Sequence, residues 1–330
     1  MRKKMSCITL LAFVCGFLAI FVSSPAGART QFVSIGTGGT GGVYYPYGGG
    51  VAEIWSKKVD GIKAVAEVTG ASVENTKLCS KGETLFGEIM SDVAYQAYTG
   101  TGKFKGKPQK ILGMFVMYPN VYHVVTRADS GVSTISDLKG RKVSVGAPGS
   151  GTEFMTNLIL EGALNIPYSS FKVFRLSFNE NANALKDNSI DVGIWCVAPP
   201  TSSIMDLATT HAIKIVPFTK NEIDRVTSKY PFYSGYTLPA GIYKGQDKEV
   251  YTASVWNTFI CNADLDVDLV YKLTKAVFEN QAYLIKIHPF AKYTTPQNAI
   301  KYSAIPLHPG AVKYIREQGI DIPERLLVKK

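Results

Sequence analysis

Residues 36–46, GTGGTGGVYYP, lie between a short apolar run, Phe32 to Ile35, and a helix-like segment, Val51 to Trp55. This order predicts a loop that joins a β-strand to an α-helix. Five glycines in seven residues let backbone N–H groups approach a ligand, and the positive end of the next helix favours a carboxylate or phosphate there. A flexible turn is the alternative, but such a turn has no use for the three adjacent rings Tyr44, Tyr45 and Tyr47. We therefore predict a ligand-binding loop.

A second loop has the same design. The β-like run Lys142 to Val145 is followed by Gly146 to Thr152 and then by an apolar-periodic segment, Phe154 to Leu164. Ser150 and Glu153 have the S-x-x-E spacing of a capping box, which predicts that a helix begins at this point. Its free N–H groups can bind an anion. The two loops together predict two α/β lobes that each contribute a helix N-terminus to a shared cleft.

Residues 1–28 have the pattern of an export signal. Arg2, Lys3 and Lys4 precede the uninterrupted apolar run Ile8 to Val22, and the small residues Ala26 to Ala28 fit a cleavage site. A retained N-terminal anchor is the alternative, although fifteen apolar residues are short for a membrane span. The sequence thus predicts a mature chain that begins after Ala28, lies in the periplasm and is not inserted in the membrane.

Charge and cysteine content exclude several classes of function. The chain carries 36 Lys and Arg against 26 Asp and Glu, and loss of the leader would lower the net charge from +10 to +7. Basic residues are scattered among acidic ones, which argues against nucleic-acid binding. The remaining cysteines are widely spaced and typical of small buried residues, although one disulfide stays open in an oxidising compartment; they are Cys79, Cys196 and Cys261. No histidine has metal-ligand spacing, and we expect neither metal nor cofactor.

The remainder of the chain alternates between strand-like and helix-like segments. Strands are expected around 64–68, 111–117, 122–125 and 190–195, and helices around 135–138, 179–187, 204–208, 269–277 and 309–319. Ser72 or Asn75 could cap a further helix. Residues 231–241 are predicted to form the return crossing between the lobes. The pattern is that of an α/β fold.

Enzymatic motifs are weak. Gly36, Gly38 and Gly41 fit the dinucleotide pattern G-x-G-x-x-G, but Thr69 and Gly70 occupy the position where an acidic residue would bind the ribose. Two S-x-x-K pairs, at 136–139 and 169–172, lack the accompanying S-D-N and K-T-G motifs. There is no G-x-S-x-G nucleophile elbow. We predict a binding protein and no catalytic residues.

Several stretches together resemble the TAXI family, the solute receptors of tripartite ATP-independent periplasmic (TRAP) transporters. These stretches are GTGGTGGVYYP, TGASVEN, DVAYQAYTGTGKFKGKP, RADSGVSTISDLKGRKVSVGAPGSGTE, KYPFYS and IPLHPGA, and the resemblance spans essentially the whole mature chain. It implies a two-lobed periplasmic-binding-protein fold of the second type with two hinge crossings and the ligand cleft between the lobes. It also implies a monomer that delivers a small carboxylate (an amino acid, a dicarboxylate or a keto acid) to a TRAP membrane permease.

The resemblance places lobe 1 at residues 29–124 and 238–330 and lobe 2 at residues 125–237. Matching positions imply ten residues in contact with the ligand: Thr40, Gly41, Tyr44, Ser72, Asn75, Ser150, Gly151, Thr152, Trp195 and Pro199. Several of these have structural alternatives, because Ser72, Asn75 and Ser150 could only cap helices. Tyr44 and Trp195 could only pack in the core.

This chain departs from the family pattern at three places. Met90 replaces the usual glutamine, which removes a hydrogen-bonding amide. Glu88 stands where an apolar strand residue is expected, and residues 197–200 replace a more glycine-containing segment. We therefore expect a carboxylate with a less polar body than glutamate. Two alternatives stay open: a periplasmic sensor for a signalling partner, and an exported enzyme on the same fold.

Overall fold

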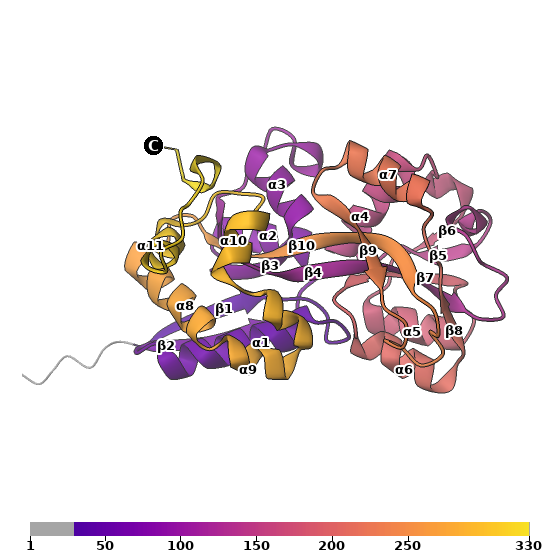
Figure 1. The fold of residues 1–330 in the computed structure, drawn as a ribbon, viewed down its shortest axis with the longest axis horizontal. Helices are drawn as coiled ribbons and strands as arrows, with labels where there is room; N and C mark the ends of the chain where they lie inside the picture. The colour runs from indigo at the N-terminus through magenta and orange to yellow at the C-terminus, as the bar shows by residue number, and fades with distance from the viewer. Residues whose placement is uncertain (1–29, 330) are drawn as a thin grey trace, which may run out of the picture.

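The computed structural model describes residues 30–329. Its centre is a ten-stranded sheet with the strand order β2-β1-β3-β10-β4-β7-β5-β6, to which β8 is added at β4 and β9 at β10. Figure 1 shows two lobes, one on either side, that are connected by the long strands β4 and β10. The export signal predicted at residues 1–28 lies outside the described residues.

The first lobe contains three parallel β-strands, and a helix follows each strand directly. Its sheet has β1 between β2 and β3, so the three strand ends lie at one edge. The elements are β1 (Gln31–Gly36), α1 (Tyr44–Lys58), β2 (Ile62–Glu67), α2 (Ser72–Lys81), β3 (Phe86–Met90) and α3 (Ser91–Thr99). The strand and helix predicted around the glycine loop are confirmed, but α1 begins at Tyr44, so the loop is shorter than residues 36–46.

Strand β4 (Ile111–Arg127) carries the chain out of the first lobe. The sequence predicted two strands separated near Pro119, but the structure has one continuous strand. Proline cannot donate to a sheet ladder. The ladder between β10 and β4 accommodates it with a register shift between Trp256 and Thr258, beside the Trp256–Pro119 pair. β4 pairs with β10 up to Val121 and with β7 from Val121 onward.

The second lobe repeats the arrangement of the first. β5 lies between the parallel strands β6 and β7, and helices follow these strands too. The elements are β5 (Lys142–Ser144), α4 (Gly151–Asn157), β6 (Lys172–Phe174), α5 (Phe178–Lys186), β7 (Val192–Val197), α6 (Ser202–Thr210), β8 (Ile213–Ile215) and α7 (Lys220–Lys229). A short 3-10 helix at Ile135–Leu138 confirms another prediction, and the helix begun by α4 continues as a π-helical turn, Leu158–Ala163.

The chain returns to the first lobe along β10 (Val250–Asn262). Residues 231–241 were predicted to make this crossing, but most of them form β9 (Tyr233–Leu238), which pairs antiparallel with Val250–Val255. From Asn257 onward β10 pairs with β3 instead. We propose the division into lobes at 29–124, 125–237 and 238–330, with the strand partners of β4 and β10 changing near Val121 and Val255.

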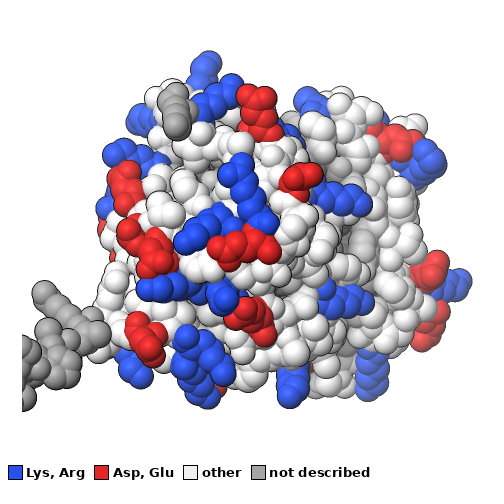
Figure 2. All heavy atoms as spheres, turned by 60° about the vertical axis from the view of Figure 1, so that its left-hand side comes forward, with Lys and Arg blue, Asp and Glu red and all other residues white. Residues whose placement is uncertain are grey.

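The C-terminal helices pack on the first lobe. They are α8 (Val267–Glu279), α9 (Gln281–Ile287), α10 (Pro296–Tyr302) and α11 (Pro309–Glu317). The face shown in Figure 2 mixes basic and acidic side chains without a basic stripe. Lys272 and Asp268 form an ion pair on α8. The buried side chains form two hydrophobic clusters, and each draws residues from both lobes, for example Trp55 with Leu207 and Ile89 with Ile223.

Candidate functional site

A cavity of about 560 Å³ lies between the two lobes. Residues at or directly after the ends of six strands line it, three from each lobe. They are 38–44 after β1, 68–72 after β2, Met90 at the end of β3, then 147–148 and 150–152 after β5, 177–179 after β6, and Cys196 and Val197 at the end of β7. In open α/β sheets, ligands bind outside the carboxyl ends of the strands. The cavity has this position in both lobes at once.

The structure brings most of the predicted site residues to this cavity. The lining includes Thr40, Gly41, Tyr44 and Ser72 from the first lobe and Ser150, Gly151 and Thr152 from the second. Asn75, Trp195 and Pro199 lie outside the lining, although all three are buried.

Asn75 supports the first loop from beneath. Its Nδ2 donates to the carbonyl oxygens of Gly36 (3.0 Å), Thr37 (2.6 Å) and Glu88 (2.9 Å), and its Oδ1 accepts from the Thr69 hydroxyl (2.6 Å). A β-carbon on Gly36 would lie 2.7 Å from Asn75 Oδ1, so this packing requires glycine there. The side chain is thus engaged with the backbone. Neither it nor Ser72 caps α2, whose N-cap residue is Ala71.

Trp195 lies outside the cavity lining but packs against a residue that belongs to it. It is fully buried, and its Nε1 donates to Ser203 Oγ (3.1 Å). Its ring stacks on Phe178 with ring centroids 6.1 Å apart, and Phe178 does line the cavity. Trp195 therefore supports the orientation of a ring that lines the cavity.

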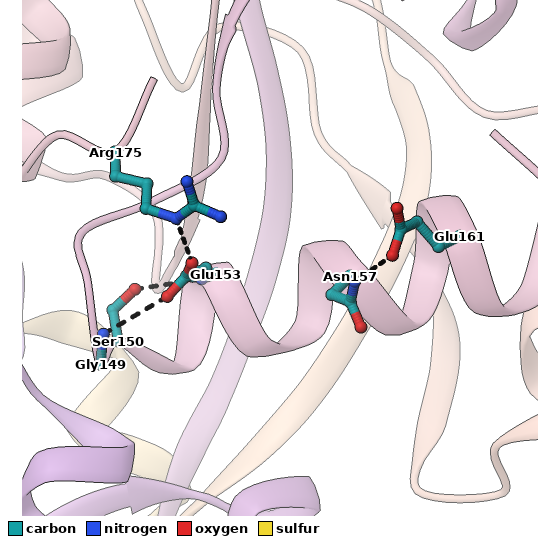
Figure 3. Close-up of polar contacts among 6 residues, drawn as sticks. All are labelled: Gly149, Ser150, Glu153, Asn157, Glu161 and Arg175. Carbon is teal, nitrogen blue, oxygen red and sulfur yellow. Dashed lines mark hydrogen bonds and ion pairs between the residues drawn. The ribbon is translucent and has the colours of Figure 1, made fainter. Parts of the chain in front are cut away.

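The loop of the second lobe is organised by the start of α4. Ser150 is the N-cap residue, and its Oγ accepts from Glu153 N (3.0 Å), as predicted. The other half of the capping box differs, because the Glu153 carboxylate accepts from Gly149 N (3.4 Å) and pairs with Arg175. Figure 3 shows Glu153 between these two partners, with Asn157 and Glu161 paired further along the helix. Arg175 is the basic side chain among the residues drawn in Figure 3, and the carboxylate of Glu153 balances its charge.

Three hydroxyl groups in the lining accept a hydrogen bond from the protein and donate none within the described residues. The donors to them are Asn179 Nδ2 to Thr40 (3.2 Å), Glu153 N to Ser150 (3.0 Å) and Cys196 N to Thr152 (3.3 Å). The Ser72 hydroxyl accepts from Met90 N (3.1 Å) and is also hydrogen-bonded to the Tyr44 hydroxyl. The Ser177 hydroxyl accepts from Glu180 N (3.5 Å) and is also hydrogen-bonded to the Glu180 carboxylate. A hydroxyl has one hydrogen to donate. Three O–H donors are therefore left for a guest rich in acceptors.

The lining contains no Asp, Glu, Lys, Arg or His among the described residues. Its positive potential comes from the backbone, because five helices begin at its edge. The N-cap residues of α1, α2, α3, α4 and α5 all line the cavity; they are Val43, Ala71, Met90, Ser150 and Ser177. Helix N-termini carry partial positive charge and favour an anion.

The lobes contact each other around the cavity. The Gly149 carbonyl of the second lobe accepts from Val73 N (3.1 Å) and Glu74 N (3.4 Å) in the first turn of α2. The Gly41 carbonyl of the first lobe accepts from three hydroxyls at the start of α6, with distances of 3.1, 3.4 and 2.8 Å for Thr201, Ser202 and Ser203. Backbone groups of both glycine-rich loops thus join the lobes.

Residues 35–319 match the model of the NMT1-like family. The chain belongs to the NMT1-like family. The matched residues span both lobes and include every residue that lines the cavity.

Solved structures with a similar fold give the architecture. A protein from Bordetella bronchiseptica RB50 superposes with a TM-score of 0.52 at 16% identity, covering 89% of this chain and 90% of that chain. A protein from work on glutathione import through GshT and the cystine ABC importer TcyBC of Streptococcus mutans superposes with a TM-score of 0.50 at 15% identity, covering 80% and 96%. The alkanesulfonate-binding protein SsuA from Xanthomonas axonopodis pv. citri superposes with a TM-score of 0.47 at 13% identity, covering 88% of this chain and 92% of that chain. The two-lobed periplasmic-binding-protein fold of the second type is confirmed.

Some residues of this NMT1-like chain line the cavity but were not predicted from the sequence. Ser177, Phe178 and Asn179 line the cavity, and Ser177 with Glu180 forms a full capping box. That S-x-x-E spacing directly after a strand was the available signal, identical to the one used at Ser150. Asn120 also lines the cavity but gave no local signal, since it lies inside β4.

Within residues 30–329, no helix has the length and apolarity to span a membrane, and no cluster of three or more His, Cys, Asp or Glu side chains has the geometry of a metal site. Cys79, Cys196 and Cys261 are buried free thiols.

Among the described residues of this NMT1-like chain, two carboxyl groups are fully buried outside the cavity lining. Asp92 lies in the first turn of α3. Its Oδ2 accepts from the hydroxyl of Tyr233 on β9 (2.6 Å), and its Oδ1 accepts from Val93 N (2.7 Å). This contact connects the first lobe to the second. Burial raises the pKa of Asp92 to about 7, although both hydrogen bonds oppose the shift.

Glu88 is the second buried carboxyl group. It occupies the middle of the fully buried strand β3, and neither carboxyl oxygen has a hydrogen-bond partner within the described residues. The position was expected to be apolar, and the side chain is fully buried. Burial raises the pKa of Glu88 well above its usual range.

We expect Glu88→Leu to raise the free energy of unfolding by about 1–3 kcal/mol at pH 7, because an unpartnered buried polar group is removed. A carboxyl group whose pKa is raised in the folded state lowers the stability increasingly as the pH rises above the pKa of the unfolded chain. The increase in the free energy of unfolding from Glu88→Leu should therefore be smaller at pH 4. Urea unfolding at both pH values measures this. Glu67→Leu on β2, where the side chain is exposed, is the control. A loss of stability at both pH values would contradict the prediction.

Proposed function

We propose that the chain is an extracytoplasmic solute-binding receptor that captures a small carboxylate. The observation that carries the proposal is the cavity itself, with three unused hydroxyl donors, five helix N-termini and no charged side chain among the described residues of its lining. A carboxylate offers about four acceptor sites and a negative charge, and it can satisfy such donors without a basic residue. Among the described residues of the lining, no Asp, Glu, Lys or His is present to act as an acid–base partner for a nucleophile, which favours binding over catalysis as the proposal.

The resemblance to TAXI receptors supports TRAP-type delivery as the finer proposal, with a monomer in the periplasm. One solved neighbour comes from work on an ABC importer, so the membrane partner needs its own test. A gene for a fused TRAP permease beside this gene would support the proposal. A neighbouring gene for a histidine kinase would support the sensor alternative instead.

Calorimetric titration of the mature chain with a panel of carboxylates, combined with small-angle scattering, tests the receptor proposal. We expect one acid to bind at a 1:1 ratio and the radius of gyration to fall, because the ligand adds contacts between the two lobes. A turnover assay on the same acids separates binding from catalysis. Proven binding with an unchanged radius would contradict closure about a hinge.

No single arginine should be indispensable for binding. Arg127 pairs with Asp129 (2.9 Å) and Arg175 pairs with Glu153, and neither arginine lines the cavity. We expect Arg127→Gln and Arg175→Gln to change affinity by less than about threefold, since backbone and hydroxyl donors hold the anion. Calorimetry measures this. A loss of about 3 kcal/mol in either variant with the fold intact would indicate a charge-assisted clamp.

A further inference from the structure

We infer that the ligand is a monocarboxylate with an apolar, uncharged body, and that amino acids and dicarboxylates are poor ligands. The inference rests on the proposed function and narrows it. It follows from three properties of the lining: which groups can donate, which groups can balance a second charge, and which surface remains once the anion is bound.

The donors are sufficient for one anion. The unused hydroxyls come from both lobes, with Thr40 on the first lobe and Ser150 and Thr152 on the second. Four further hydroxyls in the lining already donate to other groups of the protein; they belong to Tyr44, Thr69, Ser72 and Ser177. A bound carboxylate would use these donors between the lobes.

An ammonium group would have no counter-charge. No acidic side chain lines the cavity among the described residues. Glu88 is fully buried on β3 outside the lining, and two other nearby acids have partners. Glu74 accepts from Gly70 N (2.7 Å), and Asp92 accepts from the Tyr233 hydroxyl. Transfer of an unpaired ammonium from water into this site costs free energy, so the α-amino group of an amino acid would reduce affinity.

One buried acceptor does line the cavity. Asn120 is 3% exposed, and its Oδ1 has no partner in the described part of the chain. Its Nδ2 donates to the Cys196 carbonyl (3.2 Å), which fixes the orientation of the amide. A single neutral acceptor can take one O–H or N–H group of a guest, but it cannot balance a full positive charge.

A second carboxylate would find few donors, because the first would use the free hydroxyls of the lining. No Lys or Arg lines the cavity in the described chain, and Arg175 is paired with Glu153 as Figure 3 shows. The remaining surface is apolar and suits carbon atoms. Its side chains are Val43, Val68, Met90, Ala147, Phe178 and Val197. A cavity of about 560 Å³ is of the size that holds ligands bulkier than a minimal acid.

Met90 has the central place in this apolar surface. It ends β3, caps no group with its side chain, and is 2% exposed. A β-carbon on Gly151 of the other lobe would lie 2.3 Å from Met90 Sδ, so the thioether lies where the two lobes meet. A glutamine here would offer an amide to a polar ligand body, whereas methionine offers only a weak acceptor.

Calorimetric titration of the mature wild-type chain with three matched acids tests the inference. The acids are 4-methyl-2-oxopentanoate, leucine, which replaces the keto group by an ammonium, and 2-oxoglutarate, which replaces the branched end by a carboxylate; glutamate is added as a fourth. We expect the first to bind at least tenfold more tightly than each of the others. If leucine, 2-oxoglutarate or glutamate binds as tightly or more tightly, the inference is wrong and the proposed function stands. If no carboxylate binds to the folded chain, the proposed function itself is wrong, and the inference falls with it.

A variant tests the place of Met90 separately. Met90→Gln should reduce the preference for 4-methyl-2-oxopentanoate over 2-oxoglutarate at least fivefold, because it restores a polar contact in the wall. Met205→Gln is the matched control, since Met205 is exposed on α6 and does not line the cavity, and its selectivity should equal that of the wild type. Unchanged selectivity in Met90→Gln would overturn the assignment of Met90.

Discussion

Replacing Asp92 with asparagine is expected to stabilise the protein increasingly, relative to wild type, as pH rises from 4 to 7. Asp92 is fully buried and its pKa is raised to about 7, against about 3.9 in an unfolded chain. The sign follows from linkage. A carboxyl group whose pKa is raised by folding stabilises the folded state at pH values below the pKa of the unfolded chain. This stabilisation is lost as the pH rises through the pKa of the folded state. A shift of about three units corresponds to about 4 kcal/mol over this interval.

Asparagine keeps the shape of the side chain but cannot ionise, so this share of the pH dependence should disappear from the variant. Urea unfolding of both proteins at half-unit pH intervals gives the difference. Asp129→Asn, at an exposed carboxylate paired with Arg127, is the control and should lack this rise. A constant difference between wild type and Asp92→Asn across pH 4–7 would show that Asp92 stays ionised in the folded state.

Adding one methyl group at Gly41 is expected to weaken ligand binding by at least a hundredfold, or about 2.7 kcal/mol. A β-carbon at Gly41 would lie 2.2 Å from Asn179 Oδ1, 2.8 Å from Asn179 Cγ and 3.2 Å from Asn179 N. Gly41 belongs to the first lobe and Asn179 to the second. The methyl group of Gly41→Ala therefore keeps the lobes apart, and the hydroxyl donors of the two lobes cannot reach one anion together.

Calorimetry gives the affinity of this variant, and small-angle scattering gives its radius of gyration in the presence of ligand, which should stay at the unliganded value. Gly49→Ala is the control, because a β-carbon there meets no atom within 4 Å and the residue lies in α1, away from the cavity lining. Its affinity should equal that of the wild type. Wild-type affinity in Gly41→Ala would mean that ligand binding does not require this approach of the lobes.

The local parts of the site could be predicted from sequence because their signals are local. A glycine loop between a strand and a helix, and an S-x-x-E cap at Ser150, depend on neighbours within a few residues. The fold class followed from the alternation of strands and helices, and the resemblance supplied the lobes. Seven of the ten residues it implied line the cavity, although their contact with a ligand stays a prediction.

The parts that failed depend on distant residues. Asparagine is a typical helix-capping residue, but the side-chain amide of Asn75 donates instead to the carbonyl oxygens of Gly36 and Thr37, almost forty positions earlier in the chain. Pro119 reads as a strand break, and only its partner β10, more than a hundred residues later, shows that β4 continues through it. Trp195 gave no indication of whether its ring faces the cavity or the back of Phe178. Side-chain direction at such positions is decided by tertiary packing, which spacing along the chain does not report.

The position of β10 also sets an order of events during synthesis. β10 lies between β3 and β4, so the sheet of the first lobe stays divided until residues 250–262 have been made. The strands β5 to β8 pair with one another and with β4, all within residues 111–215. Contacts between nearby residues form sooner than contacts across long loops. We therefore expect the second lobe, which the middle of the chain forms, to fold first. The first lobe should complete its sheet only after β10 has been synthesised.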